Sequence, residues 1–238
     1  MIKKRTLAFA KRLKRQFRDC ISWSPWANEC WSQEGEDQIL RRIFGNQKLG
    51  FYIDVGAHHP IRFSNTYLFY RKGWSGINVD AAPDSMVSFD KKRPRDINLE
   101  VGIGKVKRSE NFYIFNEPAL NTFSERIATS LHEAESKYRI KEVVKVEVLP
   151  LSQILDRHLP KSQRIDFLNV DVEGMDFEVL DSNNWDKYKP KIILAESRSS
   201  DIDGAKKSPL GELLLNNGYN LYAKTMNTLF FKARDFPR

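Results

Sequence analysis

Several residues that could bind a nucleoside follow directly after predicted strands. The apolar run 51–55 contains Asp54 and is followed by Gly56, whose missing Cβ lets a ligand approach the backbone closely. A second apolar run ends at Asp80, 26 residues after Asp54, where an acid can accept hydrogen bonds from a ribose diol. The first loop has one glycine instead of the G-x-G-x-x-G pattern that binds a pyrophosphate. This pattern argues against a dinucleotide and favours a nucleoside ligand without phosphates.

Four residues at predicted strand ends could act as a catalytic general base. His58 and His59 lie in the loop after the first strand, and Asp171 and Glu173 follow the apolar run 165–170. Histidine has the more suitable unperturbed pKa, about 6.5. Both histidines precede a proline in a tight loop, however, so at least one could serve only to shape that loop. Asp171 and Glu173 could instead cap the helix that follows them.

Predicted strands and helices alternate along most of the chain. Strands are expected over 51–55, 76–80, 97–101, 165–170 and 191–195, and helices over 38–44, 64–72, 83–92, 177–180 and 210–215. The runs 112–115 and 143–149 are further expected strands, whereas 116–141 is polar and difficult to assign. Two final strands, 219–223 and 228–232, flank a short turn. We therefore predict an α/β, Rossmann-like, mostly parallel sheet with helices on both faces and a C-terminal antiparallel hairpin.

Five segments of the chain carry distinctive patterns: Ser32-Gln-Glu-Gly-Glu-Asp37, the segments 51–60, 63–67 and 73–80, and Asp166-Phe-Leu-Asn-Val-Asp-Val-Glu-Gly174. Together they resemble the FkbM family of S-adenosylmethionine-dependent methyltransferases. The last segment is the most distinctive, and the similarity extends from about residue 32 to residue 197. The resemblance implies a class I methyltransferase fold and S-adenosyl-L-methionine as the cofactor, which is a nucleoside ligand without phosphates.

The resemblance also implies which residues contact the cofactor. The loop from Asp54 to Gly56 would hold the methionine end, Asp80 would hold the ribose, and Asp171 would face both the cofactor and the acceptor. The family often carries lysine where Asn169 stands, so the details of these contacts differ in this chain. The implied cofactor-binding residues are Asp54, Gly56, Ala57, His58, Asp80, Ala81, Asp171, Gln33 and Asn65.

The expected reaction is O-methylation of a sugar hydroxyl on a cell-surface glycan or its precursor, and a hydroxyl of a secondary metabolite is the alternative. A hydroxyl acceptor has to lose a proton as it attacks, so a base would help. A divalent metal held by Asp171 and Glu196 would be compatible with this reaction, but two isolated acids do not support one. The acceptor side is expected to be covered by the stretch 116–141, with Phe123, Arg126, His132 and Arg139.

The basic charge of the chain belongs to its N-terminal segment. The 238 residues carry a net charge of +8, and eight of the 39 basic residues lie within 1–18, so the remaining 31 equal the 31 acidic residues. This neutral body argues against a nucleic-acid partner. The length fits one domain, 32–238, after a basic amphipathic extension, 1–31. Two cysteines favour a reducing compartment, and no apolar run approaches the roughly 18 residues of a membrane span, so we expect a cytoplasmic protein.

The N-terminal extension has two interpretations. Apolar residues recur at helical spacing within 9–21, and basic residues occupy the other positions. The segment could lie on the inner face of an anionic membrane, with Trp23, Trp26 and Trp31 as interfacial anchors. It could equally be a solvated helix that packs one face on the body. Deletion of 1–30 would abolish binding to anionic vesicles in the first case and destabilise the protein in the second.

Two other classes of protein are compatible with the predicted fold. A nicotinamide-dependent oxidoreductase or epimerase would need a glycine-rich first loop and a Tyr-x-x-x-Lys pair at a strand end, and the sequence has neither. A non-catalytic, cofactor-binding relative could be recruited through the basic N-terminal helix, but the intact acids at both strand ends argue against it, and a turnover assay distinguishes it from an enzyme. No pattern in the sequence indicates an oligomeric state.

Overall fold

The computed structural model describes residues 27–133, 137–197 and 201–237. The chain divides into two compact units, Met1–Cys30 and Trp31–Arg238, and all helices and strands given below belong to the second. The predicted N-terminal helix lies outside the described residues. Trp31 packs edge-on against Tyr67, with ring centroids 5.5 Å apart. No helix among the described residues is both long and apolar enough to cross a membrane.

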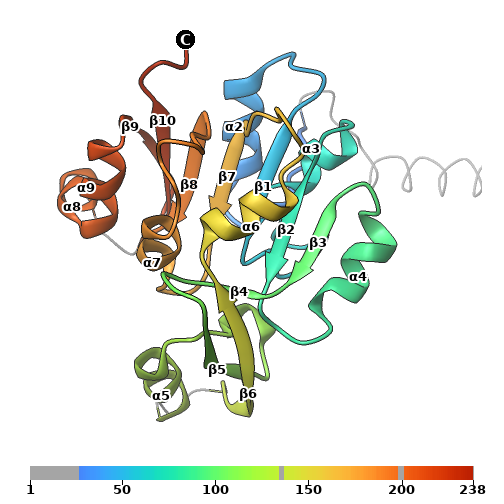
Figure 1. Ribbon diagram of the computed structural model, residues 1–238, viewed down its shortest axis with the longest axis vertical. Coiled ribbons are helices and arrows are strands. Elements are labelled where there is room, and N and C mark those ends of the chain that lie inside the picture. The colour runs from blue at the N-terminus through green and yellow to red at the C-terminus, as the bar shows by residue number, and fades with distance from the viewer. Residues whose placement is uncertain (1–26, 134–136, 198–200, 238) are drawn as a thin grey trace, which may run out of the picture. The chain divides into compact units, whose positions relative to one another are not determined.

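The central element is a seven-stranded sheet with the strand order β3-β2-β1-β7-β8-β10-β9 (Figure 1). Its strands are β1 (Phe51–Val55), β2 (Ser75–Asp80), β3 (Ile97–Glu100), β7 (Phe167–Val170), β8 (Ile192–Glu196), β9 (Tyr219–Lys224) and β10 (Thr228–Ala233). The first five pair in parallel, and β10 pairs antiparallel with both β8 and β9. The predicted mostly parallel sheet and its C-terminal antiparallel hairpin are therefore confirmed. Strand order reverses between β1 and β7, which is where such sheets bind ligands.

Helices cover both faces of this sheet, as predicted. They are α2 (Glu36–Phe44), α3 (Tyr67–Arg71), α4 (Ser85–Lys92), α6 (Leu151–His158), α7 (Asp176–Asp181), α8 (Ile202–Lys207) and α9 (Pro209–Asn216). Alternate residues of β1 face opposite sides, because side chains in a strand alternate with period two. Ile53 packs in the core under α6, α7 and α9, and Tyr52 packs in the core under α2 and α3. Every residue of β1 is buried, which explains its continuous apolar run.

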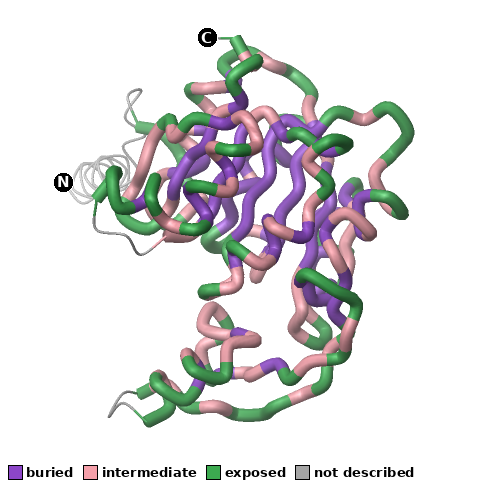
Figure 2. The backbone as a smooth tube through the Cα atoms, turned by 60° about the vertical axis from the view of Figure 1, so that its left-hand side comes forward, coloured by how far each residue is buried: buried purple, intermediate pink, exposed green. Residues whose placement is uncertain are grey.

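An insertion between β3 and α6 forms a second, three-stranded sheet with the order β4-β6-β5. It contains β4 (Gly102–Ile103), β5 (Arg108–Phe115), the short 3-10 helix η1 (Pro118–Leu120), α5 (Glu125–Glu133) and β6 (Ile140–Leu149). Figure 2 shows that residues of the insertion are mostly exposed or intermediate, whereas the middle strands of the main sheet are buried. The strands predicted at 112–115 and 143–149 exist, but they belong to this separate sheet. One face of an antiparallel sheet can remain in water, which accounts for the alternating pattern of β6.

Candidate active site

A pocket with a volume of about 430 Å³ opens at the carboxyl ends of β1, β2, β7 and β8. Its walls come from the loops after these strands, from the insertion, and from the turn between β9 and β10. Of the eleven residues predicted to bind the cofactor or to act as the base, only His59 does not line the pocket. The other ten predicted residues all line it: Gln33, Asp54, Gly56, Ala57, His58, Asn65, Asp80, Ala81, Asp171 and Glu173.

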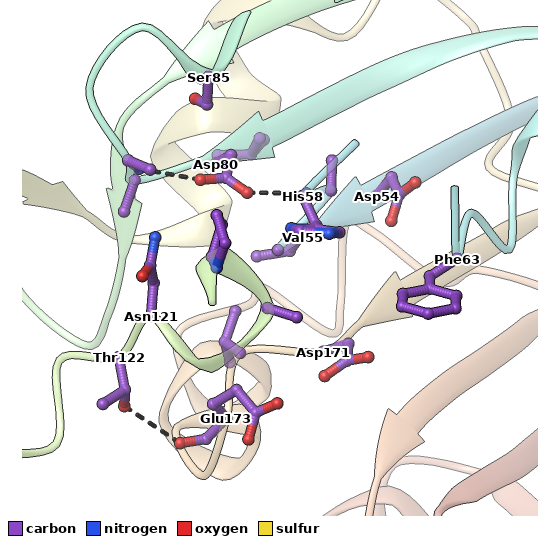
Figure 3. Close-up of a pocket in the computed structure, with 18 of the residues that line it drawn as sticks. Asp54, Val55, His58, Phe63, Asp80, Ser85, Asn121, Thr122, Asp171 and Glu173 are labelled. Carbon is purple, nitrogen blue, oxygen red and sulfur yellow. Dashed lines mark hydrogen bonds between the residues drawn. The ribbon is translucent and has the colours of Figure 1, made fainter. Parts of the chain in front are cut away.

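The end of β2 presents polar atoms suited to a ribose. The carboxylate of Asp80 accepts hydrogen bonds from the backbone amides of His58, at 2.8 Å, and Ala82, at 2.9 Å (Figure 3). Burial raises the pKa of Asp80, and it lowers the pKa of His58, so the imidazole is neutral near pH 7. The Nε2 of His58 and the Oγ of Ser85 are buried and have no hydrogen-bond partner among the described residues. Because unsatisfied buried polar atoms are rare, these atoms fit a ligand with several hydroxyl groups, such as a nucleoside.

Gly56 is required where the loop after β1 passes the loop after β7. Its φ is +78°, and a Cβ at this position would lie 1.8 Å from the carbonyl oxygen of Asp171. Any side chain would therefore separate the two loops. The glycine found in the sequence thus brings two walls of the pocket together, in addition to letting a ligand approach the backbone.

Strained backbone conformations are concentrated around this pocket. Five non-glycine residues have a positive φ within the described part of the chain, and all except Ser162 line the pocket. Such conformations persist where the surrounding structure imposes them, and they cluster at functional sites. The four pocket residues are His58, Phe63, Asp84 and Glu173.

Asp54 anchors a buried network beneath the pocket. One of its carboxylate oxygens accepts a hydrogen bond from Thr66 Oγ1 at 2.6 Å, and the other accepts one from Asn169 Nδ2 at 2.9 Å. Asn169 Oδ1 accepts in turn from Asn65 Nδ2 at 2.9 Å. Burial raises the pKa of Asp54, and the positive charge of Arg93 opposes this effect. Asp54 thus orients Asn169 and Asn65, and both of these amides line the pocket.

His59 shapes the loop after β1. Its Nδ1 accepts hydrogen bonds from the backbone amides of Ile61, at 3.0 Å, and Arg62, at 2.8 Å. An imidazole nitrogen that accepts is unprotonated, so the ring proton is on Nε2. His59 therefore matches the loop-shaping role considered for one of the two histidines.

Three carboxylates gather at the ends of β7 and β8. Oxygen atoms of Asp171, Glu173 and Glu196 lie within 4.8 Å of one another, and buried Asp176 accepts a hydrogen bond from the Glu196 amide at 2.9 Å. Asp171 is exposed toward the pocket, but desolvation by the atoms packed around its carboxyl group raises its pKa well above the ordinary value, and repulsion from Asp176 and Glu196 raises it further. An all-oxygen set of this kind can bind Ca²⁺ or Mg²⁺, but a carboxylate cluster by itself does not define a metal site. The elevated pKa makes Asp171 a stronger base than an ordinary aspartate.

Asp176 should make the stability of the protein depend on pH. Burial and the nearby Glu196 raise its pKa to about 7 in the folded state, against about 3.9 in an unfolded chain. Between these values the folded state binds more protons, so the free energy of unfolding should fall as the pH rises from about 4 to about 7. Urea unfolding of Asp176→Asn should show a weaker decrease over this range, and the exposed Asp203→Asn should behave like the wild type. An unchanged slope in Asp176→Asn would contradict the assignment.

Some pocket residues were not identified by sequence reasoning. Glu34 accepts hydrogen bonds from the backbone and side-chain amides of Asn227, at 2.9 and 2.7 Å, and both residues line the pocket. They are 193 residues apart in the sequence, so no local pattern could have paired them. The only sequence indication was that Glu34 lies within the motif at 32–37.

The insertion covers one side of the pocket. Thr122 Oγ1 donates a hydrogen bond to the backbone oxygen of Glu173 at 3.2 Å, which joins the insertion to the loop after β7. Phe123 lines the pocket, as expected for the stretch 116–141, but Arg126, His132 and Arg139 do not. His132 Nδ1 accepts from the Ile140 amide, and the Arg139 guanidinium donates to the Tyr138 carbonyl. The side chains of these three residues bond within the insertion or face solvent, so other residues of the stretch form this wall of the pocket.

The strand order and the pocket at the carboxyl ends of the strands define a class I methyltransferase fold. The model of the methyltransferase FkbM domain matches residues 54–221, more than two thirds of the chain. The chain therefore belongs to the FkbM methyltransferase family. The match begins at Asp54, so the motif at 32–37 lies outside it.

Solved structures that are similar to the chain include two methyltransferases. A TehB-like SAM-dependent methyltransferase from Corynebacterium glutamicum is 10% identical, with a TM-score of 0.39, and the similarity covers 95% of this chain and 98% of that one. A precorrin-6y C5,15-methyltransferase from Geobacter metallireducens is 11% identical, with a TM-score of 0.41, and the coverage is 82% and 87%. No curated protein matches the sequence.

Proposed function

We propose that the chain is an S-adenosylmethionine-dependent O-methyltransferase whose acceptor is a sugar hydroxyl of a cell-surface glycan or its precursor. The observation that carries the proposal is that one pocket contains two chemically different parts. Asp80, His58 and Ser85 offer polar atoms suited to a ribose, and the carboxylate of Asp171 faces the same pocket. Family membership supports methyl transfer, and a strengthened base supports an acceptor that must lose a proton.

The residues of the chain would align the acceptor and remove its proton. S-adenosylmethionine, when bound, supplies an electrophilic methyl group on a positively charged sulfur. Asp80 and the loop at Gly56 would fix the nucleoside end, which leaves the acceptor oxygen to be aligned with the methyl carbon. Asp171 would take the hydroxyl proton as the oxygen attacks, because its raised pKa lies nearer to the working pH.

The test of this function uses the full chain, methyl-labelled S-adenosylmethionine and an extract of surface glycan. We expect label to enter the glycan, and mass analysis should then locate a methyl ether on a sugar residue. Transfer only to small hydroxylated metabolites would support the secondary-metabolite alternative. Binding of the cofactor without transfer to either kind of acceptor would indicate a non-catalytic relative.

Replacement of Asp80 by alanine should weaken S-adenosylmethionine binding at least about tenfold, because hydrogen bonds to a charged group contribute about 1.5–3 kcal/mol each. Calorimetric titration measures the change. Ser85→Ala is the matched control, since it removes one neutral hydroxyl from the same part of the pocket and should cause a smaller loss. Asp80 also holds two backbone amides, so thermal unfolding of the variant must be measured alongside. If folded Asp80→Ala protein binds S-adenosylmethionine with wild-type affinity, Asp80 does not contribute to the cofactor site.

A further inference from the structure

One of the three phenylalanine rings in the pocket differs from the other two. Phe112 is buried, and its ring centroid lies 4.7 Å from that of Phe123, so these two rings pack on each other. Phe63 is 43% exposed and has no aromatic partner among the described residues. The guanidinium of Arg62 lies over the Phe63 ring, 4.2 Å from its centroid. Arg62 lies over one side of the ring, and Phe63 still keeps 43% of its surface exposed while it lines the pocket.

The loop that carries Phe63 is fixed in an unfavourable conformation. The φ of Phe63 is +57°, in the left-handed region that bulky side chains rarely adopt. On one side, His59 Nδ1 accepts hydrogen bonds from two backbone amides of the loop; on the other, Ser64 Oγ accepts one from the Tyr67 amide at 3.1 Å. A strained residue persists where its surroundings impose the conformation, and this is common where a ligand is held. The strained backbone and the partial exposure of Phe63 therefore both indicate that this residue contacts a ligand.

The groups near Phe63 in the pocket complement a sugar ring. Asp171 and Glu173, which can accept hydrogen bonds from hydroxyl groups, line the same pocket; in Figure 3 Asp171 lies on the side toward the Phe63 ring and Glu173 lies beyond it. A pyranose has a face of C–H groups that can pack on an aromatic ring, and hydroxyl groups around its edge. Binding sites commonly combine an apolar surface with a few placed polar groups in this way.

We propose that Phe63 is the platform on which the pyranose ring of the acceptor stacks, with acceptor hydroxyl groups directed toward Asp171 and Glu173. This inference rests on the proposed function and names the part of the acceptor that the pocket recognises. Phe63 is an acceptor-binding residue in this arrangement and takes no part in the proton transfer. Its aromatic ring, more than its volume, determines the affinity for the acceptor.

Saturation-transfer NMR on the full chain can test this role without turnover. The probes are the methyl glycosides of glucose, galactose and mannose, each added in the presence of S-adenosylhomocysteine. The variants are Phe63→Leu, which removes the ring, and Phe63→Trp, which retains an aromatic face. Phe177→Leu is the matched control, because Phe177 is 42% exposed and does not line the pocket.

We expect at least one glycoside to bind the wild type, with saturation strongest on the protons of one ring face. Phe63→Leu should weaken that binding about three- to tenfold, and Phe63→Trp and Phe177→Leu should retain it, with S-adenosylmethionine affinity unchanged in all variants. Equal glycoside binding in Phe63→Leu, no binding of any glycoside to the wild type, or a matching loss of S-adenosylmethionine affinity would overturn the proposal. If a glycoside binds through Phe63 but no methyl group is transferred to glycan, the proposed function is rejected, whereas the sugar-binding role of Phe63 is still supported.

Discussion

Replacement of Asp171 by asparagine is expected to lower turnover by about 10²–10⁴-fold, the range for loss of a general base. Asparagine keeps the shape of the side chain but cannot accept a proton. The cofactor affinity should change little, because the residues assigned to the nucleoside are Asp80, His58 and Ser85. Single-turnover rates together with calorimetric titration separate the two effects.

The pH dependence of turnover gives a second readout for Asp171. Desolvation by the surrounding atoms and repulsion from the nearby acids raise the pKa of Asp171 well above its ordinary value. The wild-type rate should therefore begin to fall, as the pH decreases, at a higher pH than an aspartate of ordinary pKa would cause. Asp171→Asn should lack this acidic limb. If Asp171→Asn and the alanine variants of Glu173, His58 and His59 all keep near-normal turnover, alignment of the acceptor alone carries the catalysis.

Replacement of Arg93 by methionine is expected to destabilise the protein by about 3–5 kcal/mol, the usual cost of removing one partner of a buried ion pair. Arg93 is completely buried, and its guanidinium donates to Asp96 at 2.8 Å, Thr66 at 2.9 Å and Tyr52 at 2.7 Å. Its loss would leave the carboxylate of Asp96 buried without its ion-pair partner. Urea unfolding measures the change in the free energy of unfolding.

A substitution at the neighbouring position serves as a control. It shows whether a loss of stability in Arg93→Met comes from the buried hydrogen-bond network or from the loss of a positive charge. Lys92 is the last residue of α4, directly before Arg93, and is exposed, so Lys92→Met should change stability by no more than about 0.5 kcal/mol. Arg93→Lys should fall between the wild type and Arg93→Met, because lysine retains the charge but not the planar set of donors. A loss below about 1 kcal/mol in Arg93→Met would show that the network is not a main source of stability.

The sequence by itself determined the main sheet and most of the pocket. The strands β1, β7 and β8 are buried on both faces and therefore read as continuous apolar runs. Parallel strands place their carboxyl ends at one edge of the sheet, so Asp80 and Asp171 could be expected in one site from the positions of their strands alone. The antiparallel hairpin at the end of the chain was likewise evident, because its turn and flanking strands are local in sequence.

Only the tertiary structure decided the features that depend on distant contacts. Glu34 and Asn227, which form part of the pocket wall, are 193 residues apart in the sequence, and Arg93 and its partner Tyr52 are 41 residues apart. Contacts between residues so far apart produce no local sequence pattern that could predict them. The membership of β5 and β6 in a separate sheet was equally hidden, because strand propensity does not specify which strand is the partner. The exposed, left-handed Phe63 is a further case, since its conformation is imposed by hydrogen bonds of the surrounding loop and not by its residue type.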